Sequence, residues 1–252
     1  MKIMQAVKMH HDFIKDLGHE VVMTMLIGSQ NYRLDNDTSD YDTFTLILPS
    51  ERDLYLGREP MSGEIEVEDG KCMYKDIRLA LNLLKKTSPN SVECFTGQYR
   101  YYEPKYMPIL TKYLDNENTL NKMVHCNYEH MLYAMAGMAH QLTKRNMPAG
   151  KRYSHALRLY SMKDNFLEFA PSFQLLKLLP RDYQEALHAK RDTLESHDAY
   201  YNDGCVSIAN ILDDCRDTFK KTPIQCAIEV EGLKLIEKMQ QELMHYYIKY
   251  IL

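Results

Sequence analysis

Two carboxylates downstream of a Gly-Ser dipeptide are the residues of this sequence with the clearest potential for chemistry. Asp40 and Asp42 stand two positions apart and lead into an apolar run that ends at Leu48. In a strand, alternate side chains project to the same face, so both carboxylates would point into one site. Like charges at close range resist ionisation unless a cation lies between them. Hard cations such as Mg²⁺ take carboxylate oxygens and share the rest of their shell with water and phosphates.

The Gly-Ser dipeptide strengthens this interpretation. Gly28 and Ser29 follow a short apolar run over residues 20–27. A glycine at the end of a strand lets the backbone approach a ligand with no side chain in the way. The alternative is that Asp40 and Asp42 are solvated turn and strand residues that hold no metal. The glycine upstream and the buried type of strand downstream favour a site.

The elements that must position these residues form a mixed pattern in the first half of the chain. Hydrophobic spacing predicts a helix over residues 3–17, which Gly18 ends. Apolar runs predict two strands, over 20–27 and 41–48. Asp69-Gly70 lies between two alternating segments and predicts a hairpin over 64–75. A helix over 76–86 and a short segment over 91–95 complete this part.

The pattern changes near residues 115–120, where alternation gives way to long amphipathic stretches. The expected helices cover residues 124–145, 153–167, 183–194, 206–219 and 228–252. The many methionines are most simply explained as core filler in a helical bundle. We therefore predict an α+β protein with a small mixed-sheet domain over residues 1–116 and an all-α domain over residues 117–252.

Composition excludes several classes of protein. The chain has 252 residues, an ordinary apolar content and a net charge of −4, which does not predict binding to nucleic acid by bulk charge. The six cysteines form no CxxC pair and no metal-type spacing, as expected in a reducing compartment. No signal peptide and no apolar run near the ~20 residues of a membrane span are visible. We expect a cytoplasmic protein that makes no contact with membranes.

Gly28-Ser29, a loop, and then Ser39-Asp40-Tyr41-Asp42 resemble the signature of the polymerase-β-like nucleotidyltransferases. Further blocks resemble the RNA-repair-associated RlaP or YcgL-type group of that superfamily. They are the strand that ends at Pro49, the leucine-rich helix and Pro-Asn-x-x-Glu segment over residues 77–93, and the segment over residues 151–159. These blocks occur in the right order over about residues 20–160.

The resemblance implies a polymerase-β-like domain that transfers a nucleotidyl group from an NTP to an acceptor, with an RNA end as the leading candidate. It implies Mg²⁺ or Mn²⁺ as the cofactor. The implied metal ligands are Asp40 and Asp42, which are also catalytic. The implied substrate-binding residues are Gly28, Ser29, Ser39, Lys151, His155 and Arg158. The last three have the spacing of one helix face.

Two departures from the family pattern bear on catalysis. Arg33 follows Tyr32 where the family usually has glycine, and it could bind phosphate or obstruct the site. Alignment also places Lys71 near the expected third carboxylate. Glu66 and Asp69 are the alternatives for that acid, and we take Glu66 as the catalytic candidate while Asp69 stays open.

Other functions are compatible with the sequence. The protein could be a catalytically degenerate nucleotide-binding regulator of a phage or antitoxin type, or it could attach nucleotides to a protein. Arg191, Asp192 and His197 match the pattern of HEPN ribonucleases, but residues this common match by chance easily. Labelled NTP and separate RNA and protein acceptors distinguish these alternatives.

Overall fold

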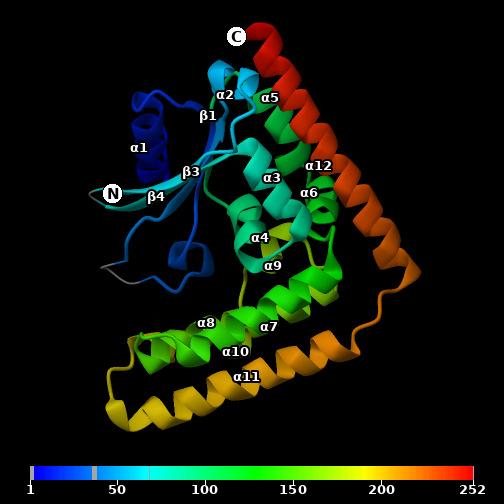
Figure 1. Ribbon diagram of the computed structural model, residues 1–252. Helices are drawn as coiled ribbons and strands as arrows, with labels where there is room; N and C mark the ends of the chain where they lie inside the picture. Colours follow the sequence, from blue (N-terminus) through cyan, green and yellow to red (C-terminus); the bar gives the residue numbers. More distant parts are fainter. Residues whose placement is uncertain (1–2, 36–38, 68, 252) are drawn as a thin grey trace.

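The computed structural model describes residues 3–35, 39–67 and 69–251. A five-stranded mixed sheet precedes a mainly helical part, so the predicted α+β class is confirmed (Figure 1). The strands are β1 (Glu20–Leu26), β2 (Thr43–Leu48), β3 (Ser62–Val67), β4 (Gly70–Asp76) and β5 (Arg100–Tyr102).

The helices of the sheet-containing part are α1 (Ile3–Asp16), α2 (Glu51–Tyr55), α3 (Ile77–Lys86), α4 (Pro89–Thr96) and α5 (Met107–Leu110). The later helices are α6 (Glu117–Val124), α7 (Tyr128–Lys144), α8 (Ala149–Leu167), α9 (Ser172–Leu175), α10 (Pro180–Arg191), α11 (Asp198–Thr218) and α12 (Pro223–Tyr250). Three short helical turns are η1 (Ser29–Tyr32), the π-helical η2 (Thr111–Asp115) and η3 (Glu195–His197).

The strand order is β3-β4-β2-β1-β5. β1 and β2 are antiparallel, with Leu26 opposite Thr43, whereas β2 and β4 are parallel, with Thr43 opposite Cys72. Every residue of β2 is buried, as are all residues of β1 after Glu20. Burial on both faces explains why these strands read as continuous apolar runs in the sequence.

The β3–β4 hairpin turns where Asp69-Gly70 predicts it, and this turn packs against the segment before β2. The Tyr41 amide donates to the Asp69 carbonyl oxygen at 2.7 Å. A Cβ on Gly70 would stand 2.7 Å from the Tyr41 carbonyl oxygen, so only glycine fits there without displacement. The contact connects the hairpin to the segment that carries Asp40 and Asp42.

The two faces of the sheet are covered differently (Figure 1). α1 covers one face, where His10 bonds to Thr43 and His11 bonds to Thr24, beside a small apolar cluster. The other face packs on α3, α4 and the helical part through one large apolar core. This core contains residues on both sides of position 116. The domain boundary predicted there stays a prediction.

In the helical part, α7 and α8 pack with α10 and α11, and α12 returns along α6, α5 and α3 toward the sheet (Figure 1). The predicted long helices are present, with their ends shifted by up to eight residues, at the start of α11. Thr222 and Gln225 form a capping box at the start of α12, and Pro223 occupies its first turn, which fixes where that helix begins.

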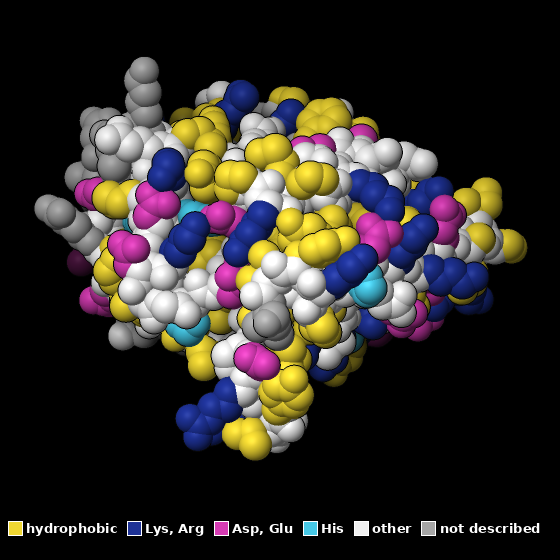
Figure 2. Space-filling model, turned by 90° about the horizontal axis from the view of Figure 1, so that it is seen from above, with side chains coloured by type: hydrophobic (Ala, Val, Ile, Leu, Met, Phe, Trp, Pro, Cys, Tyr) yellow, Lys and Arg dark blue, Asp and Glu magenta, His cyan; other side chains and the backbone are white. Residues whose placement is uncertain are grey.

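Two further observations concern the apolar character of the helices and the charges on one face. Within residues 3–35, 39–67 and 69–251, no helix has both the length and the apolar character that a membrane span requires. Seen from above, basic and acidic side chains intermingle with apolar ones, and neither sign dominates that face (Figure 2).

Candidate active site

Asp40 and Asp42 lie just before β2 and line the same cavity, as the alternation in the sequence predicts. The Asp42 carbonyl oxygen accepts from the Ile27 amide at 2.8 Å, and its carboxylate accepts from the Lys71 amide at 3.2 Å. Burial raises the pKa of Asp42 above its ordinary value, and the negative charge of Asp40 raises that pKa further. The two carboxylates are therefore close enough to repel each other.

The Gly-Ser dipeptide meets this pair of carboxylates. Gly28 has φ 84° and ψ −159°, a conformation that L-residues rarely adopt, and a Cβ on it would lie 3.5 Å from Asp42 Oδ2. The 3₁₀ turn η1 starts at Ser29, which lines the cavity. Glycine thus allows the backbone to pass close to the Asp42 carboxylate.

Glu93, from α4, fixes the position of this turn. Its side chain is 7% exposed, and its Oε1 accepts from the Gly28 amide at 2.6 Å. The buried hydroxyl of Tyr32 also bonds to Glu93. The Arg158 guanidinium lies 4.1 Å from the centre of the Tyr32 ring, a cation–π contact. A connected set of side chains therefore joins α4, the turn and α8.

The cavity between the end of the sheet and α8 has a volume of about 500 Å³. Its positively charged lining residues are Arg145, Lys151, Arg158 and Lys190. Among the described lining residues the acids are Asp40 and Asp42. Carboxylates on one wall and cations on the other suit a ligand that carries both phosphates and a hard cation.

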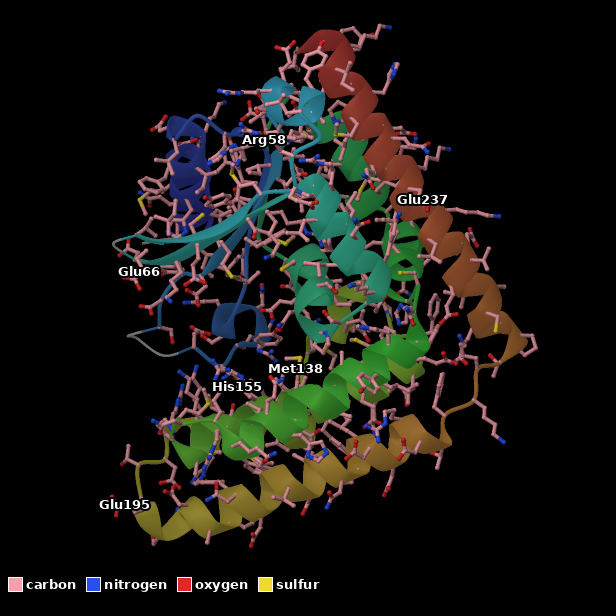
Figure 3. All side chains as sticks on the ribbon, in the orientation of Figure 1. Arg58, Glu66, Met138, His155, Glu195 and Glu237 are labelled. Atoms are coloured by element: carbon pink, nitrogen blue, oxygen red, sulfur yellow. The ribbon has the colours of Figure 1, made fainter. Side chains whose placement is uncertain are left out.

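The predicted helix face over Lys151, His155 and Arg158 does line this cavity. His155 is nevertheless not a cation. Burial lowers its pKa to about 3, and the charges of Arg158 and Lys151 add to that effect. In Figure 3, His155 lies on α8 where the helix runs beneath the sheet-containing part. At neutral pH its imidazole contributes hydrogen-bonding groups and no charge.

Two cationic residues of the cavity lie outside the sequence predictions. Arg145 caps the C-terminus of α7. Lys190 comes from α10, and its Nζ donates to the Leu34 carbonyl oxygen. Burial lowers the pKa of Lys190, and the charge of Lys151 lowers it further. Their signal in the sequence is weak, because each is a basic residue near a helix end with no motif around it.

The candidates for the third carboxylate lie apart from the cavity lining. Glu66 stands on edge strand β3 with a side chain that is 84% exposed (Figure 3). Asp69 lies near His10, on the α1 side of the sheet: burial lowers the pKa of His10, and the charge of Asp69 partly opposes that shift. Lys71 lies between β2 and β3, beside Asp42. The catalytic role of Glu66, with Asp69 as its alternative, stays a prediction.

Arg33 does not obstruct the site. It has φ 57°, the left-handed conformation that explains why glycine suits this position. Its exposed side chain lines a neighbouring cavity with Gln98 and Tyr183, and the Tyr183 hydroxyl donates to its carbonyl oxygen at 3.1 Å.

Arg191 and His197 lie at the junction of α10 and α11. His197 Nδ1 bonds to Asp192 Oδ2 at 2.5 Å, and the Tyr201 hydroxyl donates to the same oxygen at 2.7 Å. These bonds connect the two helices across the turn. They account for Asp192 and His197 without a ribonuclease, and the HEPN resemblance stays untested.

Comparison with known proteins identifies the family of the chain. A family model described as "RNA repair pathway DNA polymerase beta family" matches residues 1–170. No curated protein matches the chain significantly. Among solved structures, a nucleotidyltransferase-like protein from Exiguobacterium sibiricum matches with 12% identity and a TM-score of 0.31. That match covers 98% of this chain and 91% of the other.

Proposed function

We propose that this chain, which belongs to the RNA repair pathway DNA polymerase beta family, transfers a nucleotidyl group from an NTP to an acceptor. The observation that carries the proposal is the cavity where Asp40 and Asp42 face Lys151 and Arg158 across the Gly28 turn. A nucleoside triphosphate with a bound divalent cation has the complementary charges.

The carboxylate pair fits one hard cation. Its donors are carboxylate oxygens, and the raised pKa of Asp42 reflects repulsion and burial that a cation would offset. Asp40 and Asp42 would hold Mg²⁺ or Mn²⁺ together with phosphate oxygens and water. The bound cation would neutralise charge that builds up on the phosphate oxygens during transfer.

The chain's own residues would then position the triphosphate. Lys151 and Arg158 would hold phosphate oxygens from α8, and the Tyr32 ring keeps the Arg158 guanidinium in place. The Ser29 hydroxyl would donate to a phosphate from the opposite wall, while neutral His155 would donate a hydrogen bond without adding repulsion. Positioning of this kind supplies much of the rate in phosphoryl transfer.

An RNA end is the acceptor we propose, because the family description names RNA repair. The specific alternative is a binding protein without turnover, and the observation that favours it is Lys71 beside Asp42. Attachment of nucleotides to a protein would use the same site. The acceptor that becomes labelled distinguishes it from transfer to RNA.

The test is transfer of label from each of the four α-labelled NTPs, with Mg²⁺, to RNA or to a protein extract. We expect label on RNA, and its loss in Asp40→Asn plus Asp42→Asn. The control, Asp12→Asn plus Asp16→Asn, makes the same charge change on α1 and should retain transfer. Label on protein would change the acceptor, and binding without transfer would support the regulator. Transfer that survives the double change at Asp40 and Asp42 would contradict the site.

A further inference from the structure

We propose that Lys71 takes the place of an acidic metal ligand, so that the site holds one divalent cation with each bound NTP and not two. This inference rests on the proposed function and adds to it the metal stoichiometry of the site. A pair of cations commonly clamps both the attacking and the leaving oxygen in such transfers, and acidic side chains hold both.

The strand register places Lys71 beside Asp42. β2 and β4 are parallel, with Thr43 opposite Cys72 and Phe44 opposite Met73. Asp42 and Lys71 each come one residue before this register begins, and the Lys71 amide donates to Asp42 Oδ1 at 3.2 Å. Paired residues of neighbouring strands project to the same face, so Lys71 shares the face of Asp42. An acid at this position would reach the cation that Asp42 binds.

The cationic head of Lys71 is held on this face by the edge strand. Lys71 Nζ lies 2.9 Å from Glu64 Oε1 and 3.9 Å from Glu66 Oε1. Glu66 is opposite Lys71 in the β3–β4 pairing, one strand farther from Asp42. Two strand spacings of about 4.8 Å separate β3 from β2, so the Lys71 stem lies between Glu66 and the carboxylate pair.

On the β4 side of Asp42 the neighbouring side chain is therefore a cation, Lys71, whereas a second metal ion requires a carboxylate there. Within residues 3–35, 39–67 and 69–251, no cluster of three or more His, Cys, Asp or Glu side chains is placed to bind a metal. Asp40 and Asp42 suffice for one cation that phosphates and water complete. Lys71 puts an ammonium group, paired with Glu64, at the position where a second cation would need a carboxylate.

The test counts Mn²⁺ by electron paramagnetic resonance of the free ion, with an NTP analogue whose α–β bridge cannot be cleaved. We expect one bound Mn²⁺ per bound analogue in the wild type and two in Lys71→Asp. Lys8→Asp is the matched control, because Lys8 is also a half-exposed lysine that pairs with a carboxylate, and it should keep the count at one. Lys71 is half exposed, so its substitution should leave folding intact.

Two bound Mn²⁺ in the wild type, or one in a folded Lys71→Asp, would overturn the inference while nucleotide binding stands. Glu66→Gln gives an independent check, since we expect an unchanged count and affinity. A tenfold loss of Mn²⁺ affinity in Glu66→Gln would make Glu66 a ligand and overturn the inference as well. A wild type that binds no analogue would overturn the proposed function and this inference together.

Discussion

Replacing Glu93 with glutamine should loosen the turn that carries Gly28. The Glu93 carboxylate is buried and accepts from the Gly28 amide at 2.6 Å and from the Tyr32 hydroxyl. Glutamine keeps one oxygen acceptor but has no charge. Its NH₂ group would face either the Gly28 amide or the Tyr32 hydroxyl, and both of these are donors. A hydrogen bond to a charged group contributes about 1.5–3 kcal/mol, so we expect a loss of about 2–3 kcal/mol in the free energy of unfolding.

Thermal unfolding followed by circular dichroism measures this loss. For a chain of this size, 2–3 kcal/mol lowers the Tm by roughly 5–10 °C. Glu195→Gln, at an exposed turn, is the control and should stay within about 1 °C of the wild type. In a Tyr32→Phe background, Glu93→Gln should cost about 1 kcal/mol less, because one of its donors is gone. A Tm for Glu93→Gln equal to that of the control would refute the reasoning.

Three further changes probe the turn, the core and the loop. Gly28→Ala should cost roughly 1–3 kcal/mol in urea unfolding, because only glycine suits its backbone conformation, and should weaken NTP binding beside Asp42; unchanged stability would contradict the strain. His125 is fully buried, and burial lowers its pKa to about 4. Between pH 6.5 and 4 the unfolded chain therefore takes up a proton that the native state refuses, and stability falls as pH falls. His125→Phe should remove up to about 3 kcal/mol of the difference between unfolding free energies at pH 7 and pH 4.5, and an unchanged pH dependence would refute this assignment. Arg33→Gly should be neutral or stabilising by up to about 1 kcal/mol, and a clear drop in Tm would mean that the Arg33 side chain makes stabilising contacts.

The sheet, and the proximity of Gly28-Ser29 to Asp40 and Asp42, were predictable because their signals in the sequence are local. Runs of apolar residues in β1 and β2 reflect burial on both faces, and Asp69-Gly70 marks the hairpin by turn chemistry. Antiparallel pairing of β1 with β2 then brings Gly28 beside Asp42. The spacing of Lys151, His155 and Arg158 predicted one shared helix face, and the family resemblance predicted that this face meets the substrate.

Other features of the site depend on tertiary contacts that leave no local pattern. Lys190 reaches the cavity only because α10 packs on α8. Glu93 ends the Pro-Asn-x-x-Glu segment, but its bond to the Gly28 amide is visible only in the fold. His155 reads as part of a basic stripe, whereas burial among cations keeps it neutral. The polar layer of His10 and His11 beneath α1 could not be foreseen from an amphipathic pattern either.

The third acid shows where strand patterns lack resolution. Glu66 has the alternation of a strand residue, and this pattern fixes its face but not its distance from Asp42. The strand order, with β4 between β3 and β2, places Lys71 nearer to Asp42 than Glu66, which agrees with the alignment of Lys71 near the expected third carboxylate. A single sequence does not give that order.

The most direct test of a nucleotide site at Asp40 and Asp42 is a crystal structure with Mg²⁺ and an NTP analogue that cannot be cleaved at the α–β bridge. We predict a cation on Asp40 and Asp42 and the triphosphate extended toward Lys151. A nucleotide bound instead in the cavity of about 730 Å³ beside Arg58 and Arg78, at the other end of β2, would contradict the proposal.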